Sequence, residues 1–196
     1  MKIRPKAALI AIAIGLAVSG CIRPVRESLV SLSSNKDSSG PSRDAPVATI
    51  ALARVSVPEY LDGYDIVSRV SAHELKRDAH SRWAERLPEA STRVLRAALA
   101  EQGVRVVDGD ASVVAVSIAA FEPSGDDGAV LLSATWQVSD VHHNPTGRGA
   151  RVIEQPSGAG AVAQAAAMES ALKRLAVDIA MTINGIADVA AVATHE

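Results

Sequence analysis

Residues 113–139, V-V-A-V-S-I-A-A-F-E-P-S-G-D-D-G-A-V-L-L-S-A-T-W-Q-V-S, contain two alternating runs separated by a turn signal. Because Pro, Gly and Asp favour turns, the two runs are predicted to be neighbouring antiparallel strands. The first run is largely apolar on both faces, which is typical of a central strand. The second run has apolar residues from Val130 to Val138 on one face and polar residues on the other. One face of the second strand is therefore expected in the core and one in solvent.

Two helices are predicted, one before and one after this pair. Pro88 suits the first position of a helix, and Gly103 suits a left-handed helix end. The apolar side of that helix consists of Val94, Leu95, Ala98 and Leu99. A final helix is indicated by apolar residues at steps of three and four, which are Met168, Leu172, Leu175, Ile179, Ile183 and Ile186. This helix is expected to fray beyond Gly185.

Shorter strands are expected on both sides of the first helix. Period-two alternation predicts strands at 47–57 and 66–72, which could form a hairpin with an unusually long connection. Residues 104–107 and 150–154 also have strand character. The charged segment 73–86 gives no clear pattern and is left without an assignment.

The order of these elements predicts an α/β fold. We expect a two-layer sandwich, in which a mainly antiparallel sheet carries two helices packed on one face. The folded domain is expected to span residues 47–186, followed by a disordered tail at 187–196. The core must be aliphatic, because the whole chain has one Phe, two Trp and two Tyr.

The N-terminus has the pattern of an export signal that ends at a lipid-modified cysteine. Basic residues precede an apolar run at 7–19, and V-S-G places small residues before Cys21. The run is shorter than the roughly 20 residues of a membrane-spanning helix. V-S-G-C resembles the lipobox of bacterial lipoproteins, so residues 1–20 are predicted to be a signal peptide and Cys21 an acylated N-terminus. A buried or incidental thiol, or an ordinary cleaved signal, is the alternative.

Residues 21–46 are predicted to be a lipidated N-terminus and flexible tether, because they are rich in Ser and lack apolar periodicity. Removal of the signal changes the balance from 20 basic against 22 acidic residues to 17 against 22, a net charge of −5. Nucleic acid is therefore not expected as a partner. Cys21 is the only cysteine, so the domain is expected to rest on packing without a disulfide.

No catalytic, metal or cofactor site is predicted. The segment 158–163 mimics a dinucleotide-binding G-x-G-x-x-A, but Pro156 interrupts the strand-to-turn junction that this motif needs. The pair His142 and His143 lacks further ligands nearby in the sequence, and a solvated turn is the favoured interpretation. We therefore expect a protein that is not an enzyme.

Several segments resemble the ABC-type transport auxiliary lipoprotein family, the PqiC/YmbA-like proteins. They are V-S-V-P-E-Y-L-D-G-Y-D-I-V-S-R at 55–69, S-R-W-A-E-R-L at 81–87, T-R-V-L-R-A-A-L-A at 92–100, F-E-P at 121–123 and L-S-A-T-W-Q-V at 132–138. The most specific parts are Pro58, Tyr60, Leu61 and Asp62, then Arg69, then Arg82 to Glu85. The resemblance covers roughly residues 47–184. Two features depart from it: Ser28–Leu32 replaces an aromatic segment, and Gly63–Tyr64 replaces an Arg-Pro.

The resemblance implies an outer-membrane lipoprotein of a Pqi or Mce-type system, which moves lipid between the two membranes. The expected partner is the periplasm-spanning MCE-domain (PqiB-like) protein, and a homo-oligomer is part of the same expectation. In related lipoproteins an aspartate after the cysteine favours the inner membrane, so Ile22 points to the periplasmic face of the outer membrane. The alternatives are an envelope structural or interaction lipoprotein and a solute-binding lipoprotein of an ABC importer.

Partner or lipid contacts are expected from aromatic and apolar residues in loops, because such side chains are costly unless they are buried or used. The candidates are Tyr60, Leu61, Tyr64 and Trp83. The equally open alternative is that these side chains simply cover the end of the sheet.

Overall fold

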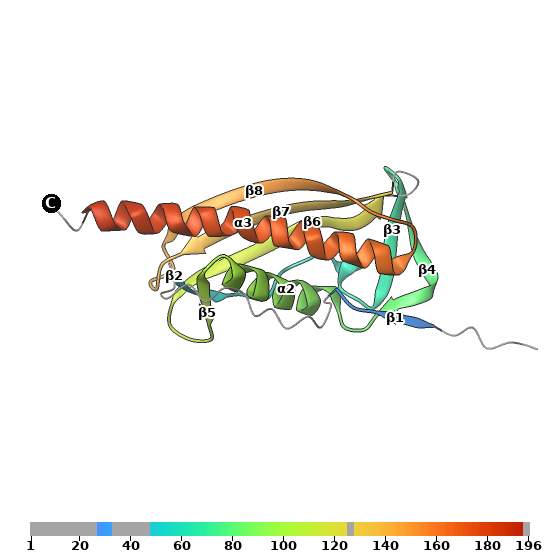
Figure 1. The fold of residues 1–196 in the computed structure, drawn as a ribbon, viewed down its shortest axis with the longest axis horizontal. Coiled ribbons are helices and arrows are strands. Elements are labelled where there is room, and N and C mark those ends of the chain that lie inside the picture. The colour runs from blue at the N-terminus through green and yellow to red at the C-terminus, as the bar shows by residue number, and fades with distance from the viewer. Residues whose placement is uncertain (1–26, 33–47, 125–127, 194–196) are drawn as a thin grey trace, which may run out of the picture.

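The computed structural model describes residues 27–32, 48–124 and 128–193 (Figure 1). These residues form an eight-stranded sheet and two long helices. The predicted signal peptide at 1–20 and the predicted lipidation site Cys21 lie outside the described residues.

Three long antiparallel strands make up the largest part of the sheet. They are β6 (Ser112–Ser124), β7 (Ala129–Ser139) and β8 (Pro145–Pro156). Each pairs with the next along the chain over most of its length. The prediction that the two runs at 113–139 are antiparallel neighbours is confirmed. The third strand is longer than the predicted segment at 150–154, because most of the expected turn before it pairs with β7.

The first half of β6 carries two further strands on its free side. β2 (Ala48–Leu52) pairs with the start of β6 in parallel, and β5 (Val104–Val107) pairs with the other edge of β2, also in parallel. Beyond β2 the chain continues beside β6, where the Ser56 N–H donates to the Val116 carbonyl at 3.0 Å. A single 3-10 turn, η1 (Glu59–Leu61), follows.

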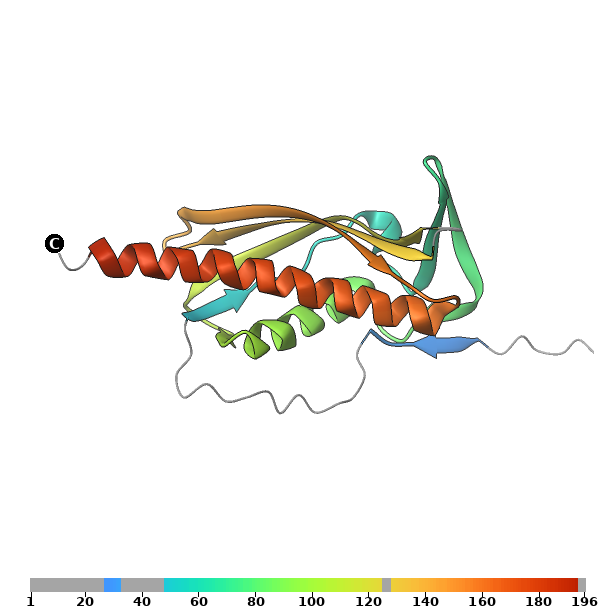
Figure 2. The ribbon, with the colours of Figure 1, turned by 45° about the horizontal axis from the view of Figure 1, so that its top comes forward.

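A projecting hairpin is attached to the end of β6. Its strands are β3 (Asp65–Ser71) and β4 (Glu74–Trp83), and it stands up from the body of the sheet in both views (Figures 1 and 2). The backbone ladder between β3 and β6 consists of the pair Arg69 and Ser124. The predicted hairpin between 47–57 and 66–72 is therefore wrong: β3 pairs with the charged segment that follows it, and β2 pairs with β5 and β6.

Two helices cover one face of the sheet and leave the other open (Figure 2). They are α2 (Leu87–Glu101) and α3 (Ala161–Ala193), and the core lies between them and the sheet. The predicted apolar sides of both helices are buried, with Leu95, Leu99, Leu172, Leu175 and Ile179 all at 0% exposure. Gly103 has φ 81°, as expected for the residue after a helix. The predicted fold class, an α/β two-layer sandwich with both helices on one face, is confirmed; the sheet is mixed, with its long pairings antiparallel.

The prediction that β6 is a central strand is confirmed, although only one face of its first half is buried. Val114, Val116 and Ile118 face the helices and are buried, whereas Ala115 and Ser117 are exposed on the opposite face. Ala115 counts as apolar in the sequence pattern, but its side chain is so small that its exposure to water has little effect on stability. β6 is central because it has neighbours on both edges, and one of its faces still lies in solvent.

The predicted domain boundaries also need correction at both ends. Residues 28–30 form a strand, β1 (Ser28–Val30), that pairs with β4 in parallel, although they were predicted to belong to the tether. Val30 and Leu32 are buried in the core at 5% and 1% exposure, which is why this short apolar segment is held. At the other end α3 continues past Gly185 to Ala193, through most of the predicted disordered tail.

Candidate functional site

A buried carboxylate joins η1, β3 and β6, which carry two of the segments that show the family resemblance. Glu122 on β6 is 0% exposed. From β3, Arg69 donates its Nε and Nη2 hydrogens to Glu122 Oε1 at 2.7 and 2.6 Å. From η1, the Tyr60 hydroxyl donates to Glu122 Oε2 at 3.1 Å, and the Phe121 N–H donates to the same oxygen at 2.8 Å. All four contacts favour the charged carboxylate, so the buried charge is paired and hydrogen-bonded.

A bulge in β6 places Glu122 on the helix-free face. The pairing with β7 shifts between Ile118 and Ala120. Before this bulge the even-numbered residues of β6 face the helices, and after it the odd-numbered residues do. Phe121 then lies opposite buried Leu132, and Glu122 lies on the other face of the strand. Without the bulge the glutamate would point into the apolar core.

The charges around this cluster shift the pKa of two of its members. Burial and the neighbouring Glu122 carboxylate raise the pKa of the Tyr60 hydroxyl, so the phenol remains protonated and keeps its hydrogen for Glu122. The hydrogen bond to Glu122 raises the pKa of the Arg69 guanidinium. The cluster is therefore a neutralised network that ties η1 and the β3–β4 hairpin to the sheet, and it offers no unpaired acid or base for catalysis.

A second group of ion pairs holds η1 to the start of α2. Arg86 Nη2 lies 2.7 Å from Asp62 Oδ1, and Arg54 Nη2 lies 2.9 Å from Glu89 Oε1. The Val55 N–H also donates to the Thr92 hydroxyl on α2 at 2.9 Å. The side chains of these ion pairs are 28% to 51% exposed, so each contributes about 1 kcal/mol or less to stability. Their role is to orient the turn.

The structure separates the four predicted contact residues into two pairs. Leu61 and Trp83 are each 4% exposed, and the Trp83 N–H donates to the Tyr64 carbonyl at 2.7 Å. Both side chains belong to the core, so the expectation that they meet a partner is corrected in favour of the structural alternative. Tyr60 and Tyr64 remain 38% and 48% exposed and stay available for contact.

The sequence did not single out Glu122 as the centre of the site. The signal was present, because F-E-P placed an acidic residue in an apolar strand. A charged residue in such a run requires a partner when it is buried. Arg69 and Tyr60 were both named in the resemblance, but nothing in the sequence indicated that they meet over Glu122.

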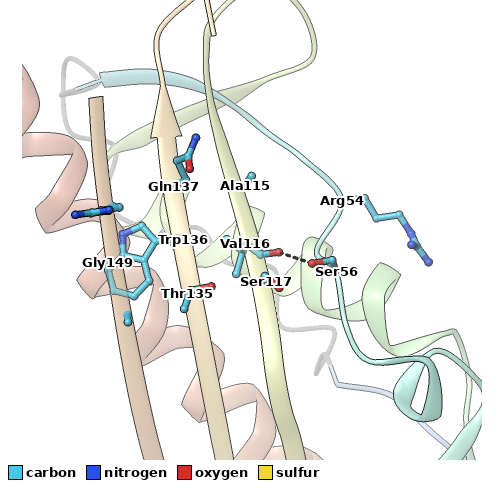
Figure 3. A pocket seen from close by; sticks show the side chains of 11 residues that line it. Arg54, Ser56, Ala115, Val116, Ser117, Thr135, Trp136, Gln137 and Gly149 are labelled. Carbon is cyan, nitrogen blue, oxygen red and sulfur yellow. Dashed lines mark hydrogen bonds between the residues drawn. The ribbon is translucent and has the colours of Figure 1, made fainter. Parts of the chain in front are cut away.

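The open sheet face holds a trough of about 800 Å³ across β6, β7 and β8 (Figure 3). Small side chains line most of it, among them Ala115, Ser117, Thr135 and Ala150. Arg54 and Arg148 stand at its sides. The Arg54 side chain is engaged by acidic residues, whereas the Arg148 side chain has no ion pair or hydrogen bond within the described part of the chain. The trough is open and polar-edged, which suits contact with a protein surface better than enclosure of a small molecule.

A glycine shapes one wall of this trough. The Trp136 ring lies flat against Gly149, its cross-strand partner, and its Nε1 donates to the Thr182 hydroxyl on α3 at 3.1 Å. A Cβ added at Gly149 would lie 2.1 Å from Trp136 Cζ2. The indole therefore lies against β8 and reaches α3 only because β8 has no side chain at this position.

Gly149→Ala is expected to lower the free energy of unfolding by about 1–3 kcal/mol, since the added methyl forces Trp136 off its position. Gly185→Ala on α3 is the matched control, because an added Cβ there meets nothing within 4 Å. This control is expected to raise stability by up to about 1 kcal/mol through the helix preference of alanine. Urea unfolding followed by tryptophan fluorescence measures both, and equal effects would contradict the packing argument.

Metal-binding and membrane-spanning features are absent within residues 27–32, 48–124 and 128–193. No group of three or more His, Cys, Asp or Glu residues there could hold a metal ion. His142 lies in a turn whose backbone hydrogen bonds go to Asp140. None of the helices in the same ranges is long and apolar enough to cross a membrane.

Comparisons with solved structures agree with this fold. The chain is similar to a protein whose structure is described as that of an uncharacterized protein, with a TM-score of 0.67, 19% identity, and coverage of 81% of this chain and 99% of that one. It is also similar to protein XCC0632 from Xanthomonas campestris, of the DUF330 family, with a TM-score of 0.64, 18% identity, and coverage of 84% and 96%. At these identities the likeness concerns the fold. No curated protein matches the chain.

A family model extends the comparison to the sequence itself. The model of the ABC-type transport auxiliary lipoprotein component matches residues 31–180, which is more than half of the chain. That range begins within the segment after β1 and includes η1, the β3–β4 hairpin, the trough and most of α3. The chain therefore belongs to the ABC-type transport auxiliary lipoprotein component family.

Proposed function

We propose that this protein is the outer-membrane lipoprotein subunit of a Pqi or Mce-type lipid transport system, and that it docks the periplasm-spanning MCE-domain protein. Cys21, acylated after removal of residues 1–20, anchors it to the periplasmic face of the outer membrane. The protein contributes position and recognition, and it is not an enzyme. Membership of a transport auxiliary lipoprotein family supports the proposal.

The observation that carries the docking role is the open face of β6, β7 and β8. Two helices cover one side of the sheet and none covers the other, where the trough lies beside the η1 turn (Figures 2 and 3). Small side chains allow another protein to approach the sheet closely. Arg148 supplies a positive charge without an acidic neighbour in the described part of the chain, so the segment of the MCE protein that binds here is acidic. Tyr60 adds an exposed aromatic edge beside this face.

Ala115→Tyr is expected to reduce recovery of the MCE protein at least tenfold, which corresponds to about 1.4 kcal/mol, because the new ring fills the trough. Ala100→Tyr is the matched control, since Ala100 is equally exposed but lies on α2, in the helix layer. Purification of the tagged lipoprotein from detergent-solubilised envelopes, with quantification of the MCE protein, measures both. Equal loss in the two variants, or no loss in either, would reject the open face as the docking surface.

An envelope interaction lipoprotein without a role in lipid traffic would have the same anchor and fold. It would recover a peptidoglycan-associated or cell-wall protein in the same purification instead of an MCE protein. A solute-binding role would require an enclosed cleft, and the trough on the sheet is open to solvent.

A further inference from the structure

We infer that the end of the domain formed by β1, the β3–β4 hairpin and the start of α3 lies against the membrane surface, with the C-terminal end of α3 pointing away from it. These elements gather at one end of the long axis of the molecule, and the C-terminus of α3 lies at the other (Figures 1 and 2). The inference rests on the lipid anchor at Cys21 proposed above and adds the orientation of the domain on its membrane.

The β1 strand fixes the point at which the chain enters the domain. Ser28, Leu29 and Val30 pair with Ser81, Arg82 and Trp83 of β4, and the Ala84 N–H donates to the Val30 carbonyl at 2.8 Å. Val30 and Leu32 are buried, so the segment is held by apolar packing as well as by backbone pairing. The chain that precedes Ser28 is therefore attached to the domain at β4.

Chain length then limits how far this end can be from the bilayer. Cys21 and Ser28 are seven residues apart, which permits at most about 25 Å between them. If the domain began at β2, the first held residue would be Ala48, and the same limit would be about 90 Å. The pairing of β1 thus replaces a long tether with a short one and keeps the domain close to the membrane.

The direction of β1 points the anchor toward the hairpin. Because β1 is parallel to β4, the chain before Ser28 leaves the domain on the side from which β4 arrives. Seven residues separate Glu74 from Ser81 on β4, the same number as separate Cys21 from Ser28. The acylated cysteine can therefore reach the level of the hairpin tip, and the tip is expected to face the lipid headgroups.

The side chains at this end suit a lipid interface. The described residues include ten large hydrophobic side chains with high exposure, and five of them belong to these elements or directly precede them: Leu29, Tyr64, Val70, Leu75 and Val162. The hairpin adds exposed charges of both signs, with Lys76 and Arg77 between Glu74 and Asp78, and Arg77 lies 3.3 Å from the Asp65 carboxylate. Apolar side chains next to basic ones are the usual chemistry of proteins that lie on a membrane surface. The occupant of this patch is therefore the bilayer that holds the acyl chains.

The opposite end is too distant to reach the same surface. α3 has 33 residues and is about 50 Å long. The β6–β7 turn lies near the hairpin, because Ser124 at the end of β6 pairs with Arg69 of β3. Since β6, β7 and β8 are antiparallel, the β7–β8 turn lies at the opposite end of the sheet. His73 in the hairpin turn and His142 in the β7–β8 turn are both exposed, and they mark the two ends.

Fluorescent labels at these two positions test the orientation. In full-length acylated protein the sulfur of Cys21, the only native cysteine, is blocked, so His73→Cys and His142→Cys each provide one free thiol. The labelled proteins are reconstituted into vesicles of phosphatidylethanolamine and phosphatidylglycerol that carry nitroxide on a fraction of the headgroups. We expect the label at position 73 to be quenched several-fold more than the label at 142. Equal quenching, or stronger quenching at 142, would overturn the inference.

Two insertions test whether β1 sets the distance. A Gly-Ser segment of about 20 residues placed between Arg26 and Glu27 lengthens the tether before β1 and is expected to reduce quenching at 73 toward the level at 142. The same segment placed between Ser38 and Ser39, after β1, is expected to leave the quenching unchanged. Loss in both proteins, or in neither, would overturn the role assigned to β1.

The mass of the N-terminal peptide separates this inference from the proposed anchor. A peptide without acyl chains would reject the lipidation of Cys21 and, with it, the orientation. An acylated protein that is quenched equally at both positions would leave the anchor in place and reject only the orientation.

Discussion

Cys21→Ala is expected to release the protein from the membrane almost completely. Each buried methylene contributes about 0.8 kcal/mol to membrane binding, so the loss of two or more acyl chains removes a stable anchor. The domain is expected to remain folded, because the core begins at Val30 and does not include the cysteine. Fractionation of the envelope, followed by thermal unfolding of the purified variant, measures both effects.

Ile22→Asp is the control for this prediction, because it changes the neighbouring residue and leaves the cysteine in place. This variant is expected to stay membrane-bound and to move from the outer to the inner membrane. Radiolabelled palmitate should enter the Ile22→Asp protein and not the Cys21→Ala protein. A Cys21→Ala protein that still sediments with the outer membrane and supports transport would contradict the lipoprotein assignment.

Arg69→Met is expected to lower the free energy of unfolding by about 3–5 kcal/mol, because it leaves the Glu122 carboxylate buried without its counter-ion. Met keeps the aliphatic stem and removes the charge, so the loss reports mainly on the ion pair. The midpoint of urea unfolding should fall while the slope changes little. Arg93→Met is the control: Arg93 pairs with Glu85 at the surface, where an ion pair contributes about 1 kcal/mol or less.

A double-mutant cycle separates the ion pair from general damage to the hairpin. Glu122→Gln in the Arg69→Met background removes the unpaired charge and is expected to recover a large part of the lost stability. Tyr60→Phe removes one hydrogen bond to the carboxylate and is expected to cost about 1.5–3 kcal/mol at most. If the effects of Arg69→Met and Glu122→Gln simply add, the two side chains do not act as a pair.

The sequence was sufficient for the parts of the fold in which local pattern and burial agree. β6, β7, α2 and the apolar face of α3 all have the period of their own secondary structure, and each buries the face that this period indicates. Pro88 and Gly103 marked the ends of α2 for stereochemical reasons that do not depend on the rest of the chain. These predictions needed no knowledge of which strands are neighbours.

Prediction failed where a distant partner decides the outcome. β1 has three residues and lies in a Ser-rich segment, so its local sequence does not predict a strand. It is a strand because it pairs with β4 and because Val30 and Leu32 are buried in the core. β4 is charged along almost its whole length because both of its faces are exposed in the projecting hairpin, so it shows no apolar alternation. The pairing of β2 with β5 instead of β3 likewise depends on topology and not on local pattern.

The candidate site was only partly predictable for a related reason. Tyr60 and Arg69 could be named from the resemblance, but the bulge near Ala120 that turns Glu122 toward them has no signature in the sequence. Leu61 and Trp83 looked like exposed loop residues because the sequence does not show what covers them. Trp136 and Gly149 lie on different strands, and their contact follows from register alone.

The pairing of β1 with β4 also sets an order of events during biogenesis. β1 is synthesised first among the described strands, but Ser28 meets its partner Ser81 only after about 50 further residues, and closing so long a loop is slow compared with forming a local hairpin. β3 and β4, joined by a two-residue turn, can form before β1 docks. The hairpin is therefore expected to form first, and β1 is expected to dock on a β4 strand that is already paired with β3.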